Sequence, residues 1–177
     1  MAEADALRSV FVYGSLLDEA SLMASLGHRS DPPASQPFEL DGWERAWNVV
    51  SARTFHREDR PAGPAVRRIV LGLRPAPSTR CQGVLLALDE ADRAALAPRE
   101  AAYDLLEVGG AEGRTPVWTY VPRPERVLGH VAVTEPLVVE RAYLRSCRAG
   151  MARHELHEAR AEVDAALGTL PVVDAAA

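Results

Sequence analysis

The chain has no lysine. All 20 of its basic residues are arginine, and 25 acidic residues outnumber them, which leaves a formal charge of −5. This balance argues against a protein that binds nucleic acid by charge alone, because such binding needs a surplus of basic side chains. We therefore expect no nucleic-acid partner. The many alanine and arginine residues are more typical of a compositional bias than of a functional device.

Long apolar runs are also missing. No stretch approaches 18 consecutive apolar residues, so we expect no membrane span. Met1 to Arg8 contains acids and lacks the apolar core of a signal peptide. The two cysteines, Cys81 and Cys147, have no C-x-x-C spacing. That pattern favours buried, reduced thiols in a cytoplasmic protein, and leaves a disulfide between them as the alternative.

The length and composition are those of a globular chain. Its 177 residues include 47% hydrophobic residues, enough to bury a sizeable core within one domain. We expect a single domain over 1–177, with loose termini at about 1–8 and 169–177. The sequence contains no internal repeat and no linker long enough to divide it.

The stretch from Val10 to Leu16 is the most informative local pattern. Apolar residues with a strong preference for strands run directly into Gly14-Ser15, and a helix-like pattern follows. A strand that turns at glycine into a helix exposes backbone N–H groups to one small volume, which attracts a carboxylate or phosphate. The alternative is a buried first strand that ends in an ordinary turn.

The remaining pattern predicts strands interrupted by short helices, followed by helices. Strands are expected over 38–51 with a break at 41–42, and over 66–73, 81–88, 102–108 and 115–121. Helices are expected over 18–26, 89–97, 138–149 and 153–167, an exposed loop over 53–65 and a turn over 109–113. This order predicts a mixed α+β fold: a mainly antiparallel sheet, curled or closed into a small β-barrel, with flanking helices.

Glu100 is the candidate proton-transfer residue. It follows a helix that Pro98 closes, and Ala101 and Ala102 come directly after it. A carboxylate in such a segment can face an apolar pocket, where burial raises its pKa toward neutrality and makes it a useful acid or base. The alternative is a solvated surface acid paired with Arg99.

Two motifs together resemble the γ-glutamylcyclotransferase (ChaC-like) superfamily. The first is the Tyr13-Gly14-Ser15-Leu16 turn, and the second is the Arg-Glu-x-x-Tyr pattern of residues 99–103. Further segments similar to that family follow in the expected order: Gly42–Asn48, Gln82–Leu88, Thr119–Val121 and Tyr143–Gly150. The resemblance covers about residues 10 to 150.

The resemblance implies a reaction and a set of site residues. A γ-glutamyl compound would cyclise to 5-oxoproline and release its amine, without cofactor or metal. Glu100 would transfer the protons, and Tyr13, Gly14, Ser15 and Leu16 would bind the substrate, with backbone N–H groups holding its α-carboxylate. Tyr103 would orient Glu100 or the substrate. For both Tyr13 and Tyr103, packing is the alternative role.

The substrate stays open at this point. Ala101 and Ala102 stand where relatives that act on glutathione tend to have glycine, so glutathione, a γ-glutamyl amino acid and a γ-glutamylamine all remain candidates. The partner is therefore a small γ-glutamyl molecule, and the oligomeric state is undetermined. A second hypothesis keeps the same fold as a binding module that holds a small carboxylate without turning it over.

Other candidate sites are weaker. His154 and His157 are one residue short of the H-E-x-x-H zinc motif, which makes a solvated helix face more probable than a metal site. Four arginines could form a basic patch for phosphate or nucleic acid: Arg57, Arg60, Arg67 and Arg68. Acidic residues lie among them, which favours a solvated loop instead. Trp43 and Trp47 could contact a ligand or pack in the core.

Overall fold

The computed structural model describes residues 8–109 and 116–176. Its elements, in chain order, are β1 (Arg8–Val12), η1 (Ser15–Leu17), α1 (Glu19–Ser25), β2 (Ser35–Phe55), β3 (Val66–Leu88), α2 (Glu90–Leu96), β4 (Tyr103–Gly109), β5 (Val117–Pro122), η2 (Pro124–Arg126), β6 (Leu137–Glu140), α3 (Arg141–Arg153), α4 (His157–Leu167) and β7 (Val172–Val173). Most of the N-terminal segment that was expected to be loose, and most of the predicted turn at 109–113, lie outside the described residues.

The described strands form one mixed, curled sheet. Its order is β4-β5-β1-β3-β6-β7, and β2 pairs with β3 beside this path. Most paired residues belong to antiparallel neighbours, since β2 follows β3 over most of its length, whereas β1–β5, β3–β6 and β6–β7 are short parallel pairs. The α+β class and the mainly antiparallel, curled sheet are therefore confirmed. Among the described strands, no pairing closes the sheet into a barrel.

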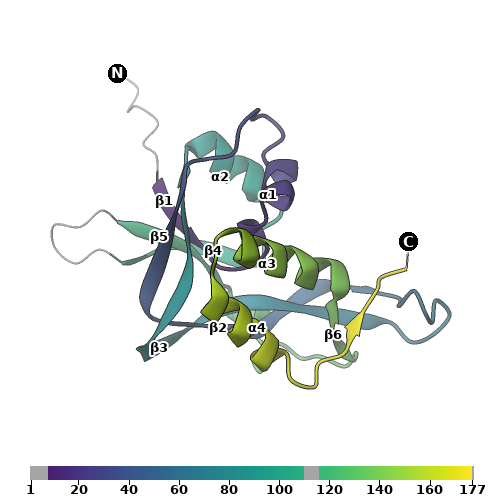
Figure 1. The fold of residues 1–177 in the computed structure, drawn as a ribbon. Helices are drawn as coiled ribbons and strands as arrows, with labels where there is room; N and C mark the ends of the chain where they lie inside the picture. Colours follow the sequence, from purple (N-terminus) through teal and green to yellow (C-terminus); the bar gives the residue numbers. More distant parts are fainter. Residues whose placement is uncertain (1–7, 110–115, 177) are drawn as a thin grey trace.

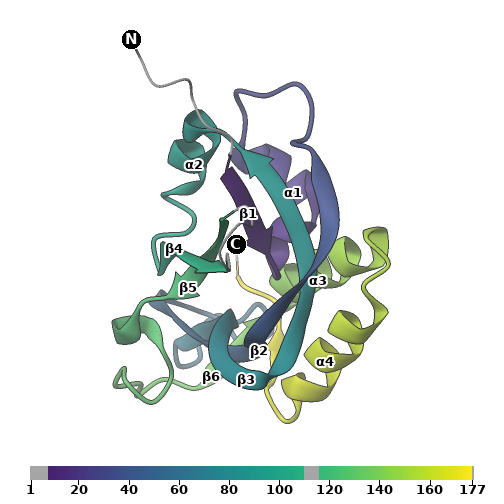
Figure 2. The same cartoon turned by 90° about the vertical axis from the view of Figure 1, so that its left-hand side faces the viewer.

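The long β2–β3 ribbon gives the molecule its shape. Figure 2 shows it curving past β1, β4 and β5, with α3 and α4 on its other side. Figure 1 shows α1 and α2 together at one end of the molecule. Among the described helices, none has both the length and the apolar character that crossing a membrane requires.

β1 lies at the centre of the core because its side chains are apolar on both faces. Val10 and Phe11 are fully buried and Val12 nearly so, between β3 on one side and β5 on the other. A strand buried on both faces needs a continuous apolar run, which is the pattern that the sequence has here. β1 therefore brings the turn that follows it into the middle of the molecule.

Two predicted interruptions are wrong, because the strands continue through them. β2 passes the expected break at 41–42 with a shift in register, where Gly42 has a φ of +80°. β3 likewise continues through the proline-rich segment between the two strands expected there. Pro75 pairs with Trp43 and Arg80 with Asp41, so several β3 residues lie opposite Gly42. Such a bulge absorbs the extra residues without ending the strand.

The C-terminal half also differs from the prediction. The segment expected to start a helix at Val138 is strand β6, whose Val138 and Val139 are buried and branched at Cβ. The helix begins only at Arg141. The terminus from 169, expected to be loose, contains β7, which pairs with β6, and Val173 is buried. The loop expected from Arg53 begins only after Phe55.

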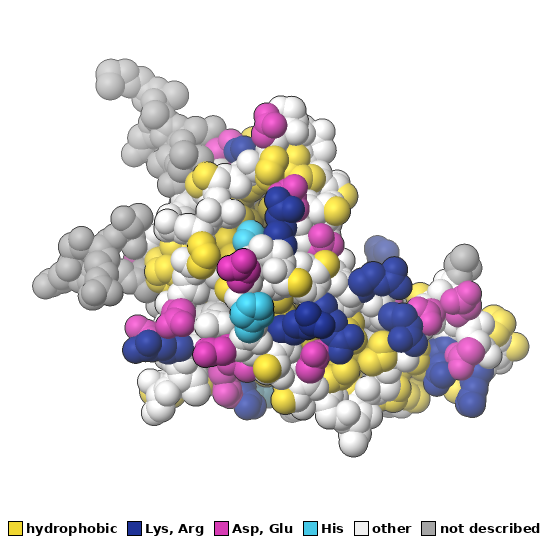
Figure 3. All heavy atoms as spheres, viewed as in Figure 1, with side chains coloured by type: hydrophobic (Ala, Val, Ile, Leu, Met, Phe, Trp, Pro, Cys, Tyr) yellow, Lys and Arg dark blue, Asp and Glu magenta, His cyan; other side chains and the backbone are white. Residues whose placement is uncertain are grey.

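Charged side chains are mixed on the face drawn in Figure 3. Dark-blue arginine side chains and magenta acidic side chains lie interspersed on it. Two surface pairs of this kind are Arg148 with Asp164 at 2.6 Å, between α3 and α4, and Arg141 with Asp174 at 3.1 Å. Such pairs neutralise part of the arginine charge of the surface.

Candidate active site

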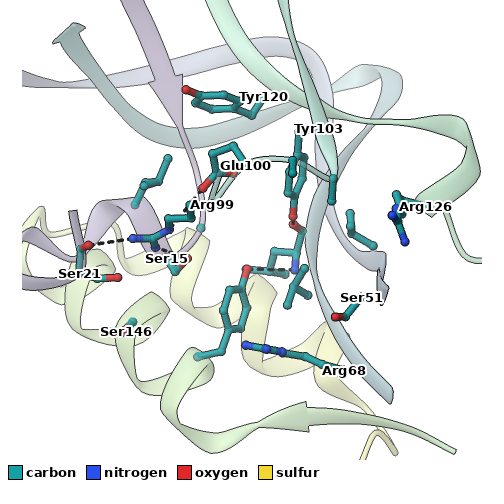
Figure 4. Close-up of a pocket in the computed structure, with 18 of the residues that line it drawn as sticks. Ser15, Ser21, Ser51, Arg68, Arg99, Glu100, Tyr103, Tyr120, Arg126 and Ser146 are labelled. Carbon is teal, nitrogen blue, oxygen red and sulfur yellow. Dashed lines mark hydrogen bonds and ion pairs between the residues drawn. The ribbon is translucent and has the colours of Figure 1, made fainter. Parts of the chain in front are cut away.

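A pocket of about 680 Å³ lies where the turn after β1 meets the segment after α2. Its walls come from β1, η1, β2, β3, the 98–103 segment and the start of α3. The predicted site residues all line it: Tyr13, Gly14, Ser15, Leu16, Glu100 and Tyr103. Figure 4 shows Ser15 and Glu100 on the same side of this pocket.

A buried arginine donates a hydrogen bond to the backbone at the turn. Arg45, on β2, donates from Nε to the Tyr13 carbonyl oxygen at 2.8 Å and from Nη2 to the Gln82 carbonyl oxygen. Its third contact is an ion pair with Glu162 of α4 at 2.8 Å. Arg45 is only 8% exposed, and each of its three guanidinium nitrogens makes one of these contacts. Its role is to fix the backbone that carries the turn.

The turn enters a short 3₁₀ helix, and the α-helix begins only at Glu19. The Leu17 N–H donates to the Gly14 carbonyl at 3.1 Å. Within the described residues, no hydrogen bond takes the N–H of Ser15 or Leu16. Two residues that line the pocket thus carry backbone donors without a partner in the described part of the chain, whereas the neighbouring helix is too short to add a large dipole.

Gly14 is a glycine because another side chain lies against it. A Cβ at this position would lie 3.3 Å from the Tyr143 hydroxyl oxygen, which is tighter than an ordinary carbon contact. The backbone at Gly14 has a φ of −126°, outside the left-handed region that favours glycine. The close approach of the Tyr143 side chain of α3 leaves little room for a larger residue at this position.

Glu100 lies in a tight turn after α2, with its side chain largely withdrawn from solvent. The Glu100 N–H donates to the Leu96 carbonyl at 3.0 Å, and the Tyr103 N–H donates to the Glu100 carbonyl at 2.9 Å. Its side chain is 11% exposed. Burial raises the pKa of Glu100 to about 7, against a smaller opposing effect of the Arg99 charge. The carboxyl group therefore exchanges protons close to neutral pH.

Arg99 connects Glu100 to the turn. Its Nη2 donates to Ser15 Oγ at 2.9 Å, and its Nε lies 3.3 Å from Glu100 Oε1. Its Nη1 donates to the Ser21 carbonyl at 2.8 Å and to Ser25 Oγ at 3.0 Å, which ties the guanidinium to α1. One side chain thus places the Glu100 carboxylate and the Ser15 hydroxyl beside each other (Figure 4).

The pocket tyrosines use their hydroxyls to hold the walls. Tyr13 donates to the Tyr120 carbonyl at 2.8 Å, and Tyr103 donates to the Leu71 carbonyl at 2.7 Å. The Leu71 N–H donates to the Tyr143 hydroxyl at 3.1 Å. Burial raises the pKa of Tyr13, Tyr103 and Tyr143 well above the usual value, so all three stay neutral. The hydroxyl protons of Tyr13 and Tyr103 are thus used within the walls of the pocket.

Comparison with known proteins identifies solved structures that share this fold. No protein-family model and no curated protein matches the sequence. Among solved structures, one titled "Gamma-glutamyl cyclotransferase" matches with a TM-score of 0.60 and 15% identity, covering 90% of this chain and 87% of that one. The chain has the γ-glutamylcyclotransferase-like fold.

Two other structures carry the same fold. A γ-glutamyl cyclotransferase specific to glutathione, from yeast, matches with a TM-score of 0.56 and 17% identity, over 91% of this chain and 97% of that one. YkqA from Bacillus subtilis matches with a TM-score of 0.59 and 19% identity. This match includes 94% of the present chain but only 56% of the YkqA chain, which is longer. At 15–19% identity, these matches show a shared γ-glutamylcyclotransferase-like fold and do not identify a shared reaction or substrate.

The opposite side of the pocket holds residues that the sequence did not single out as site residues. Ser51, Arg68 and Arg126 lie there (Figure 4), and Arg53 also lines the cavity. Arg68 was assigned to a solvated loop, but it lies on β3 and pairs with Glu140 at 2.8 Å. Only the three-dimensional course of β2, β3 and η2 brings these side chains together.

The weaker candidates fall outside the pocket. Trp47 donates from Nε1 to the Val163 carbonyl at 3.3 Å in the core, and Trp43 packs against the core without lining the pocket. His154 caps α3 and His157 begins α4, so the predicted solvated helix face is instead the junction of two helices. Cys81 and Cys147 are buried free thiols, which confirms the packing interpretation.

One cluster has the residue types of a metal site. The side-chain ligand atoms of His28, Asp89 and Asp92 lie within 4.8 Å of one another. Arg29 occupies the same carboxylates, however, with Nε–Asp92 at 2.5 Å and Nη2–Asp89 at 3.1 Å. The two aspartates also form the capping box of α2. The cluster is accounted for as a structural ion-pair network that fixes the start of this helix.

Proposed function

We propose that this protein cyclises a γ-glutamyl compound to 5-oxoproline and releases the attached amine, with Glu100 as the acid and base. The observation that carries the proposal is the position of Glu100: a buried carboxyl group with a pKa of about 7, in one pocket with the free N–H groups of the turn. A carboxylate whose pKa lies near the working pH is suited to accept and return a proton.

The reaction needs little beyond positioning and proton transfer. The α-amino nitrogen of the substrate attacks its own γ-carbonyl carbon, so the enzyme holds a folded conformer and supplies no nucleophile. The α-ammonium group first loses one proton to solvent, which frees the lone pair that attacks. Glu100 then accepts a second proton from this nitrogen as the new C–N bond forms, and donates it to the nitrogen of the leaving amine as the old C–N bond breaks. The lactam N–H and the free amine are the products, and Glu100 returns to its ionised form.

The turn would bind the other end of the glutamyl group. We assign the α-carboxylate of the substrate to the N–H groups of Ser15 and Leu16, which have no partner among the described residues. Arg99 adds a positive charge nearby and holds the Ser15 hydroxyl in place. Tyr13 and Tyr103 would then shape the cavity with their rings, and Gly14 would keep the turn close to α3. The cytoplasmic location expected from the cysteine pattern stays a prediction.

A panel of γ-glutamyl compounds tests the proposal. The purified protein is incubated with γ-glutamyl amino acids, glutathione and γ-glutamylethylamine, and 5-oxoproline and the free amine are measured by mass spectrometry. We expect the two products in equal amounts from at least one compound. No release from any member would contradict the enzyme and favour a module that binds a small carboxylate without converting it.

A further inference from the structure

The pocket carries more positive than negative charge, although the whole chain is acidic. Four of its lining residues are arginines, Arg53, Arg68, Arg99 and Arg126, and two are acids, Glu100 and Glu140. The chain as a whole has a formal charge of −5. A local excess of guanidinium groups in an acidic protein is a feature of this cavity, and it favours an anionic ligand.

Two of these arginines have no acidic partner among the residues that the structure describes. Arg68 pairs with Glu140, and Arg99 is engaged by Glu100 and three seryl oxygens. Among the ion pairs of the described residues, none includes Arg53 or Arg126. A guanidinium group presents a planar fork of N–H donors that matches a carboxylate. The two unpaired groups therefore offer places for two carboxylates.

The position of Arg126 is set by the sheet. The residue ends η2, directly before a bridge between Val127 and Val49 of β2, and the Leu128 N–H donates to the Asn48 carbonyl at 2.8 Å. Arg126 is half-buried rather than free in solvent. Its backbone is thus anchored against β2, and β2 also supplies Ser51 and Arg53 to the lining of the pocket.

The two sides of the pocket suit the two ends of a substrate. Figure 4 shows Ser15, Arg99 and Glu100 on one side, and Ser51, Arg68 and Arg126 on the other. If the glutamyl group lies on the turn with its γ-carbonyl at Glu100, the leaving amine points toward the second side. This orientation rests on the proposed function.

We infer that the leaving amine is an acidic amino acid, whose two carboxylates are bound at the pocket mouth by Arg53 and Arg126. The substrate class is then a γ-glutamyl conjugate of a dicarboxylic amino acid. A γ-glutamylamine without carboxylates would leave both guanidinium groups unpaired in the complex. It would therefore be a poorer substrate, because it lacks the charge-assisted contacts that carboxylates make with these guanidinium groups.

Three isosteric substrates test the charge requirement. They are γ-glutamylglutamate, γ-glutamylglutamine and γ-glutamylglutaminamide, whose leaving amines carry two, one and no carboxylates. We expect kcat/KM to fall by about tenfold at each step, as expected for one lost charge-assisted contact. Equal kcat/KM values for the glutamate and glutamine conjugates overturn the inference.

A pair of arginine variants locates the effect. Arg126→Gln removes one of the two proposed contacts, so it reduces the ratio of kcat/KM for the glutamate conjugate to that for the glutaminamide conjugate by about tenfold. Arg145→Gln is the matched control: it removes the same charge from an exposed position on α3, outside the pocket. An equal change in both variants would indicate long-range steering and overturn a specific contact.

Direct binding separates this inference from the proposed function. Calorimetry with the Glu100→Gln protein compares the affinities of the glutamate and glutaminamide conjugates without turnover. Tighter binding of the glutamate conjugate supports the anion subsite even if the wild-type protein releases no 5-oxoproline. Equal affinities, or no binding of either compound, overturn the subsite, whereas release of 5-oxoproline from the uncharged conjugate alone would leave the proposed reaction intact.

Discussion

Glu100 is held in an environment that disfavours its charge. Its carboxylate lies among apolar and aromatic pocket walls and keeps one close cation, Arg99, at 3.3 Å. The guanidinium of Arg99 is shared with Ser15, Ser21 and Ser25, so only part of its attraction reaches Glu100. The cost of burial exceeds this attraction, which is why the pKa rises to about 7 instead of falling.

The raised pKa has a consequence for stability. In the unfolded chain the Glu100 carboxyl group titrates near 4.5, and in the folded protein near 7. Between these values the folded state binds one more proton, so the free energy of unfolding decreases as the pH rises from about 4.5 to 7. The contribution is at most about 3 kcal/mol. We expect Glu100→Gln to be more stable than wild type at pH 8, by up to this amount, and little different at pH 4.5.

Urea unfolding at a series of pH values measures this difference. Glu90→Gln is a suitable control, because it makes the same change at an exposed glutamate at the start of α2. A stability difference between Glu100→Gln and wild type that does not change between pH 4.5 and 8 would show that the Glu100 pKa is not raised.

At the scale of elements, the site depends on how closely α3 packs on η1. Gly150 makes this contact possible: a Cβ there would lie 2.4 Å from the Leu17 carbonyl carbon and 2.6 Å from the Asp18 nitrogen. Both of these atoms belong to the backbone, so a change of side-chain rotamer cannot relieve the clash. The backbone of η1 carries Ser15 and Leu16, which links helix packing directly to the proposed carboxylate site.

Gly150→Ala is therefore expected to affect both stability and activity. The forced separation of α3 and η1 should cost about 1–3 kcal/mol in unfolding free energy, by analogy with overpacked cores. A displaced turn should also lower kcat/KM by roughly tenfold or more. Chemical denaturation and the 5-oxoproline assay measure the two effects.

Gly27→Ala is the control for this substitution, because a Cβ at Gly27 meets no atom within 4 Å. It should change neither quantity appreciably. If Gly150→Ala behaved like Gly27→Ala, the contact between α3 and the turn would not limit the geometry of the site.

Elements with strong local signals were predictable, and elements defined by distant partners were not. The α2 helix was expected from its Asp89 cap and Pro98 stop, and the structure places it at Glu90–Leu96. β6 was mistaken for the start of a helix, because Leu137–Glu140 is extended only through its pairing with β3 and β7. The interruption expected near Gly42 is wrong for a similar reason, since pairing with β3 continues across the bulge.

At the scale of the whole molecule, the sheet brings together segments that are more than 80 residues apart. β1 lies between β3 and β5, and the turn after it meets the segment after α2 through the Arg99–Ser15 hydrogen bond. The turn and Glu100 could be singled out in advance because each belongs to a contiguous motif. The pocket positions of Arg68 and Arg126 could not, since neither belongs to a local site motif and only the fold brings both to one pocket.

The central claim is that this pocket performs proton transfer through Glu100. The most direct measurement is the rate of 5-oxoproline release by Glu100→Gln, using the best substrate of the panel, beside wild type and Glu90→Gln. Circular dichroism and thermal unfolding check that all three proteins fold. We predict a loss of about a thousandfold in kcat for Glu100→Gln, as expected when a general acid and base is removed, and no appreciable loss for Glu90→Gln. Turnover by folded Glu100→Gln within about tenfold of wild type would contradict this account, because general acid–base catalysis contributes at least about a hundredfold.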